Sequence, residues 1–124
     1  MLRAFLMVGI GGFFGSMARY GVSYISNKYI VHNYPFATFI VNVVGCFLIG
    51  LLFGLGQKHV WFNTNWYLLL AGGFCGGFTT FSSFALENIL LIEKQQFGMA
   101  LLYTALSVVV GLIVCKLGMS LVTQ

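Results

Sequence analysis

The chain is apolar over four long stretches, which three short polar connectors separate. A membrane-spanning helix needs about 20 mostly apolar residues. The stretches predict spanning helices at about residues 3–26, 36–57, 65–92 and 97–121. Trp and Tyr side chains flank the connectors, as expected for anchors at the membrane interface. The pattern therefore predicts an all-α integral membrane protein with four transmembrane helices and a single domain over residues 1–124.

The third stretch contains a segment that is unusual for a helix in lipid. It has glycines at positions 72, 73, 76 and 77, and four hydroxyl residues follow: Thr79, Thr80, Ser82 and Ser83. Each Gly costs about 1 kcal/mol against Ala in a helix interior. Non-helical backbone at membrane depth persists only where protein buries it or where it lines a polar cavity. We therefore expect the third helix to be broken between Gly76 and Thr80, with the freed backbone groups in use.

The composition excludes several functions. Hydrophobic residues make up 60% of the chain and charged residues 6%, whereas a soluble domain carries about 25% charged residues. The net charge of +4 includes no basic run, so nucleic acid is not an expected partner. Asp is absent and both histidines fall in connectors, which argues against an enzyme. We expect a multi-pass protein of the cell inner membrane, with its three isolated cysteines acting as small buried hydrophobes.

The positive charges are evenly divided between the two ends of the bundle. Four spans place both termini on one side, with Arg3, Lys58 and Lys116; the other side has Lys28, Lys94 and, if it reaches the interface, Arg19. Orientation normally follows an excess of Lys and Arg. Either the chain inserts in both orientations, or the charges are too few to decide. We favour dual topology, which predicts an antiparallel homodimer with a two-fold axis in the membrane plane.

Small residues in the first two helices suggest close packing. Gly9, Gly12 and Gly15 recur every three residues, and Gly50 and Gly54 have GxxxG spacing. Small residues let helices approach closely in lipid. Packing among the four helices explains part of this pattern. The chain has 16 glycines in all, more than one small bundle needs, so we also expect a second copy as partner.

Polar residues inside a membrane are expensive and usually functional. Thr38 and Asn42 lie one turn apart on the second helix. The Asn42 amide is expected either to hold an interhelical hydrogen bond or to face a pore. Two further pairs share helix faces by their spacing: Phe81 with Phe84 on the third helix and, as a weaker signal, Tyr103 with Ser107 on the fourth.

Two charged residues lie near the ends of the spans. Arg19 is expected either to extend to the interface or to raise the potential for an anion, and Glu87 to line a vestibule wall. Hydroxyl and amide groups donate hydrogen bonds, and aromatic rings have a positive edge. Rings of Asp or Glu, which select cations in channels, are absent. The inventory favours an anion as the transported ion.

The segment at residues 72–87, GGFCGGFTTFSSFALE, strongly resembles the helix 3 signature of the Fluc (CrcB-type) fluoride channels. The segment GGFFGSMARY at residues 11–20 and the segment TFIVN at residues 38–42 support the resemblance. It covers essentially the whole chain, at matching length and number of spans. Ser83 stands where Thr is frequent in the family, and the hydroxyl donor is retained.

The resemblance implies an antiparallel, dual-topology homodimer with two fluoride pores. It assigns the pore to Asn42, to ring edges of Phe81 and Phe84, and to Thr80, Ser82, Ser83, Thr38, Ser107 and Tyr103. It places Arg19 near the entrance and Glu87 in the vestibule. The backbone carbonyls of Gly76 and Thr79 are implied to hold a structural Na⁺ at the dimer centre.

The function implied by the resemblance is passive fluoride export across the cell membrane, which gives fluoride resistance. The expected partners are an inverted second copy, the fluoride ion and membrane lipid. The alternative is a proton-coupled exporter of small molecules with four helices and dual topology. Such an exporter needs a titratable group in the membrane, and Glu87 is the only candidate.

Overall fold

A computed structural model describes residues 1–30, 34–62 and 64–123, and the regular secondary structure of these residues is entirely helical. In chain order the helices are α1 (Leu2–Tyr29), α2 (Phe36–Lys58), α3 (Asn65–Tyr67), the π-helical η1 (Leu68–Cys75), α4 (Gly76–Phe78), α5 (Phe81–Glu93) and α6 (Phe97–Thr123). Four units are long and apolar enough to cross a membrane: α1, α2, the α3–α5 series and α6. The four predicted spans are confirmed, and each observed end lies within about three residues of the predicted one.

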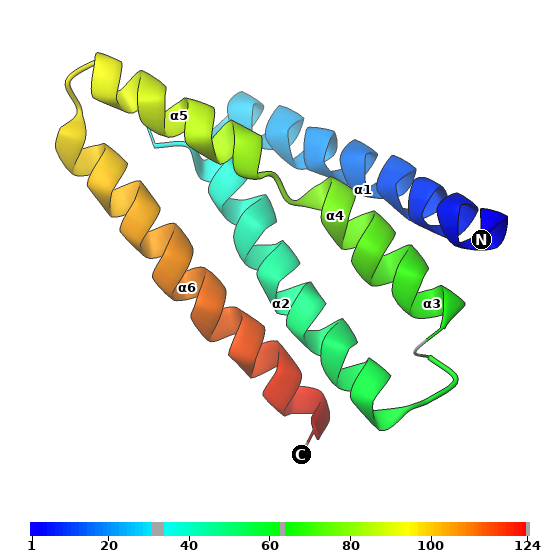
Figure 1. Ribbon diagram of the computed structural model, residues 1–124. Helices are drawn as coiled ribbons and strands as arrows, with labels where there is room; N and C mark the ends of the chain where they lie inside the picture. The colour runs from blue at the N-terminus through cyan, green and yellow to red at the C-terminus, as the bar shows by residue number, and fades with distance from the viewer. Residues whose placement is uncertain (31–33, 63, 124) are drawn as a thin grey trace.

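The spans are arranged as two pairs (Figure 1). The first helix, α1, packs along η1 and α4, while α2 packs along α6. The Nζ atom of Lys58 donates to the Val122 carbonyl at 3.3 Å, so α2 and α6 end side by side. The turn between α5 and α6 lies at the opposite end of the bundle (Figure 1).

Glycine brings the paired helices into backbone contact. A Cβ atom on Gly15 would overlap the Phe74 carbonyl, and one on Gly11 would overlap the Leu69 carbonyl. On the other pair, a Cβ on Gly50 would overlap the Cys115 carbonyl. Gly9, in contrast, has nothing within 4 Å of such a Cβ. Much of the small-residue pattern therefore serves packing within one chain, and self-association stays a prediction.

The break in the third span is confirmed, but it is shorter than the sequence suggested. Only Thr79 (φ −87°, ψ 160°) and Thr80 (φ −151°, ψ 119°) are extended. Gly76 and Gly77 belong to α4 and are helical. A Cβ on Gly77 would lie 2.6 Å from the Gly12 carbonyl. Packing against α1 therefore explains this glycine, and the expected start of the break at Gly76 moves to Thr79.

Candidate functional site

The break interrupts the helical hydrogen bonds at membrane depth. The N–H and the side-chain hydroxyl of Thr79 both donate to the Cys75 carbonyl, at 3.0 and 2.8 Å. The next N–H, that of Thr80, donates instead to Oδ1 of Asn42 at 2.8 Å. The Gly76 carbonyl therefore loses the partner that a continuous helix would give it.

Asn42 pairs with the extended backbone across the gap between two helices. Its Nδ2 atom donates to the Thr80 carbonyl at 3.1 Å, while its Oδ1 accepts from the Thr80 N–H. The interhelical hydrogen bond expected for this residue is thus observed. The amide nitrogen carries two hydrogens, so a second donor remains on a residue that also faces a groove, described below.

Thr80 ends the break by capping α5. Its Oγ1 accepts from the Ser83 N–H at 3.2 Å and lies 3.2 Å from Ser83 Oγ and 3.3 Å from Ser82 Oγ. Thr and Ser are preferred at this position because their oxygens satisfy free N–H groups. The N-terminus of a helix has a positive partial charge. The hydroxyl cluster therefore sits at the positive end of α5, inside the membrane.

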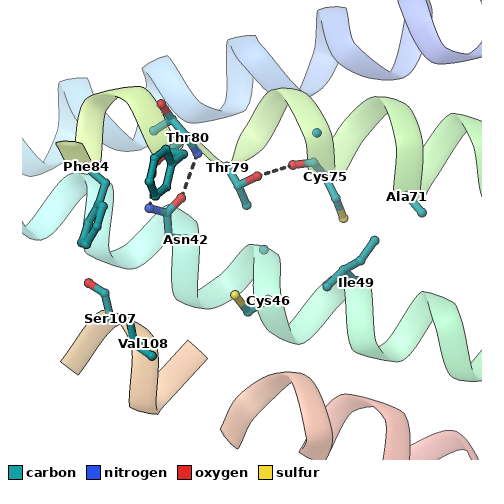
Figure 2. A pocket seen from close by; sticks show the side chains of 13 residues that line it. Asn42, Cys46, Ile49, Ala71, Cys75, Thr79, Thr80, Phe84, Ser107 and Val108 are labelled. Atoms are coloured by element: carbon teal, nitrogen blue, oxygen red, sulfur yellow. Dashed lines mark hydrogen bonds between the residues drawn. The ribbon is translucent and has the colours of Figure 1, made fainter. Parts of the chain in front are cut away.

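A groove of about 460 Å³ runs along the break (Figure 2). It is lined by Asn42, Gly45, Cys46, Ile49, Ala71, Cys75, Gly76, Thr79, Thr80, Phe81, Phe84, Ser107 and Val108. None of these residues is charged. The groove brings together five predicted pore residues from α2, α5, α6 and the break, and adds Gly76 and Thr79, the two predicted sodium ligands.

The aromatic pair and Ser107 differ in how they are partnered. The Phe81 and Phe84 rings have centroids 5.9 Å apart, and Phe84 also packs against Tyr103 at 5.0 Å. The Phe81 side chain is 79% exposed. Ser107 points its hydroxyl from α6 into the groove (Figure 2), and this buried oxygen has no hydrogen-bond partner within the described chain. An unsatisfied buried hydroxyl costs about 1–3 kcal/mol, so a ligand in the groove would relieve that cost.

A second hollow, of about 270 Å³, lies on the other side of the break; we call it the vestibule. It is lined by Ser16, Arg19, Tyr20, Ser23, Ala37, Thr38, Val41, Thr80, Ser83 and Glu87. Thr80 lines both the vestibule and the groove. The extended segment is thus a thin wall between the two spaces.

Arg19 is directed into the protein and not toward the interface. Its Nε atom donates to the Gly77 carbonyl at 3.0 Å, one of the carbonyls left at the end of α4. The expectation that it extends to the membrane surface is therefore wrong. The alternative, a cation that raises the local potential for an anion, agrees with its place in the vestibule.

Glu87 ties three helices together in the vestibule wall. Its two carboxylate oxygens accept from the Thr38 hydroxyl at 2.8 Å and from the Tyr103 hydroxyl at 2.9 Å. Thr38 is 6% exposed and Tyr103 is fully buried. Neither hydroxyl reaches the groove, so the structure places these two predicted pore residues in support of the vestibule.

Several lining residues were not predicted from the sequence. Ser16, Tyr20 and Ser23 line the vestibule, and their helical spacing with Arg19 was the signal that they share a face. Cys46 and Cys75 line the groove, although both are at least half-buried, as expected. The Thr104 hydroxyl lines neither space; it donates to Oδ1 of Asn88 at 3.0 Å and joins α5 to α6.

The described residues contain no cluster of three or more His, Cys, Asp or Glu side chains that would hold a metal. Any cation bound near the break would therefore rely on neutral oxygens. Backbone carbonyl oxygens are the hard ligands that small cations accept. Gly76 and Thr79 line the groove, and their carbonyl oxygens are ligands of the kind that a hard cation accepts.

Comparison with known proteins gives consistent matches over almost the whole chain. A family model described as CrcB-like protein, Camphor Resistance (CrcB), matches residues 6–119. A protein of Azobacteroides pseudotrichonymphae named fluoride-specific ion channel FluC is 41% identical over 118 residues, or 95% of this chain and 94% of the relative. Relatives of the same name from Flavobacterium psychrophilum and Chlorobium phaeobacteroides are 40% and 45% identical, over 95% and 90% of this chain and 95% and 86% of their own lengths.

Proposed function

The chain belongs to the CrcB-like family of fluoride channels, and from this premise we propose that it exports fluoride passively and so confers fluoride resistance. Membership makes it an ion channel and not an enzyme. Its four spanning helices make it a multi-pass membrane protein, which fits the inner membrane of a bacterium.

The observation that carries the proposal is the set of donors around an uncharged groove. Asn42 has a second amide hydrogen, Ser107 has an unpartnered hydroxyl, and the phenylalanine rings offer positive edges. A small anion sheds strongly held water on entering such a space, and each lost contact must be replaced. An acid side chain would repel it, and none lines the groove.

The route that we propose leads from the vestibule past Thr80 into the groove. Arg19 attracts the anion into the vestibule, where Ser83 and Thr80 present hydroxyls. The only acid in that wall, Glu87, has both oxygens occupied by hydroxyl donors. The anion then meets Asn42, Phe81, Phe84 and Ser107 beyond the wall, with the Ser82 hydroxyl beside Thr80.

A single copy leaves this route open, and an inverted second copy would close it. Phe81 is 79% exposed, and an added Cβ on Gly76 would meet nothing within 4 Å. A two-fold axis makes the same patch face itself. An inverted dimer would thus cover both grooves and give two equivalent pores, one running beside each break.

We further propose that a structural sodium ion sits between the two breaks. Gly76 and Thr79 both line the groove, and a two-fold axis would double their two carbonyl oxygens to four. A bound cation would supply positive charge beside the pores and offset the cost of holding an anion in a low-dielectric setting. The protein's part is to aim the carbonyls, which Asn42 and Arg19 do by holding the break on either side.

The proton-coupled exporter remains a second candidate with weaker support. It requires an acid that alternates between proton and substrate. Both Glu87 oxygens already accept a hydrogen bond, one from Thr38 and one from Tyr103, so a substrate would compete with these two donors for the carboxylate. A passive channel needs no such group, because fluoride that enters a cell as neutral HF dissociates at neutral pH and leaves down its own gradient.

The test is ion efflux from liposomes that contain the purified protein. Vesicles loaded with fluoride should empty once a potassium ionophore balances the charge, and vesicles loaded with chloride should stay full. The rate should not change when a proton gradient is imposed or collapsed. Chloride efflux equal to fluoride efflux, or efflux that requires a proton gradient, would overturn the proposal.

A further inference from the structure

One face of α1 stays polar from the vestibule to the end of the helix. Successive residues are about 100° apart around a helix axis, so Ser16, Tyr20, Ser23 and Asn27 fall within about 60° of one another. This face lies in a chain that is only 6% charged and mostly apolar. Polar side chains along a lipid-spanning helix usually face protein or water.

A third hollow, of about 450 Å³, lies over the outer part of this face, and is lined by Tyr20, Ser23, Tyr24, Asn27 and Lys28. Tyr20 and Ser23 also line the vestibule. The two hollows therefore adjoin, and together they extend from Thr80 at the break to Lys28 in the last turn of α1. Arg19 and Lys28 are nine residues apart, which is about 14 Å along the helix axis.

The chemistry of this path suits an anion. Its walls offer hydroxyls from serine and tyrosine, the amide of Asn27, and a cation at each end. No acid lines the outer hollow. The ammonium group of Lys28 lies over the Tyr29 ring at 5.5 Å from its centroid, which keeps the charge near the rim.

We propose that this face is an access track for fluoride, with Lys28 as the residue that draws the anion to its outer end. The track rests on the proposed channel function and adds an entrance to it. Lys28 acts at a distance, by raising the local concentration of the anion, and makes no contact with fluoride inside the pore. Such steering depends on ionic strength.

The expected effect follows from the size of one charge in water. Two unit charges about 7 Å apart in water attract enough to raise a local anion concentration about threefold. At about 10 mM salt the field of Lys28 extends about 30 Å, and at 1 M about 3 Å. The track therefore predicts a charge effect at low salt that disappears at high salt.

The experiment measures initial fluoride efflux from liposomes of neutral lipid, at fluoride well below saturation, with potassium gluconate setting the ionic strength. At low salt, Lys28→Gln should reduce the rate about threefold and Lys28→Glu about sevenfold, and Lys28→Arg should match wild type. All four should agree at 1 M gluconate. The matched control is Lys94→Glu, because Lys94 is exposed and lies beyond the C-terminal end of α5 but lines none of the three hollows.

Equal losses for Lys28→Glu and Lys94→Glu would reduce the effect to general surface charge and overturn the track. Wild-type rates in Lys28→Glu at low salt would do the same. A loss that appears only with anionic lipid would show that Lys28 binds a lipid headgroup, which also contradicts the proposal. None of these results affects the channel function, which wild-type efflux measures separately.

Discussion

At the scale of single residues, Asn42 and Thr80 organise the site. The Asn42 amide oxygen replaces the helical acceptor of the Thr80 N–H, and its nitrogen donates to the Thr80 carbonyl. The Thr80 hydroxyl caps the N-terminus of α5. These hydrogen bonds satisfy backbone groups that a helix interruption would otherwise leave free in lipid. They also fix the extended segment that separates the vestibule from the groove. Thr79 has a different part, because its hydroxyl is bonded back to Cys75 and only its backbone remains for an ion.

This difference predicts opposite outcomes for two conservative changes. Asn42→Asp removes the donor to the Thr80 carbonyl and places a negative charge in the groove. Efflux of fluoride should fall about ten- to hundredfold, because losses of about 1–3 kcal/mol are expected for such a buried change. Thr79→Ser keeps the hydroxyl and the carbonyl, so its efflux should stay within about twofold of wild type.

Size-exclusion chromatography should show the same assembly for both variants, so that the efflux rates compare intact proteins. Near wild-type efflux in Asn42→Asp would remove Asn42 from the pore. A severe loss in Thr79→Ser would show that the side chain, and not the backbone carbonyl, carries the function of Thr79.

The sequence predicted the residues of the site better than it predicted their roles. The spacing of Phe81 with Phe84 placed both on one face, and both line the groove. Thr38 and Tyr103 carry hydroxyls at plausible depth, yet they point at Glu87. The sequence shows which hydrogen-bond donors are present. Which acceptor each donor meets depends on the rotation of its helix, and packing across the bundle sets that rotation.

At the scale of helices, glycine decides how near the spans approach. The glycines at positions 9, 12 and 15 look alike in the sequence, but their surroundings differ. A Cβ on Gly15 would overlap the Phe74 carbonyl, one on Gly12 would lie 3.8 Å from the Gly73 carbonyl, and one on Gly9 would meet nothing within 4 Å. The contact at Gly15 involves backbone, which cannot move aside as a flexible side chain can.

Gly15→Ala should therefore destabilise the protein by about 1–3 kcal/mol, the usual cost of overfilling a packed site. Gly9→Ala, on the same helix, should leave stability unchanged or raise it by up to about 1 kcal/mol through helix propensity. Thermal unfolding in detergent, followed by circular dichroism, measures both. Equal melting temperatures for the two variants would contradict the close contact between α1 and η1.

Helix positions were predictable because the apolar stretches are long and the connectors are polar. The limits of the break were not predictable, because the glycine run at residues 72–77 is equally typical of a weakened helix and of a helix that packs closely against a neighbour. The structure shows a closely packed helix here, π-helical in η1 and α-helical in α4. The reason is tertiary, since α1 supplies the backbone against which those glycines pack.

At the scale of the whole molecule, we propose that one chain forms half of the conducting assembly. The groove has an exposed Phe81 on its border, and the two proposed sodium ligands, Gly76 and Thr79, would supply only two carbonyl oxygens per chain. The even charge count at the two ends fits insertion in both directions. We propose that two copies in opposite orientations complete the conducting site.

Labelling from one side of the membrane tests that claim most directly. A variant with its three cysteines changed to serine receives a single cysteine, either Gln95→Cys at the turn after α5 or Val60→Cys at the opposite end; both positions are exposed. A membrane-impermeant maleimide is added to spheroplasts, before and after permeabilisation. Insertion in both orientations predicts that about half of the copies react from outside at each position. Complete labelling at one position and none at the other would contradict it.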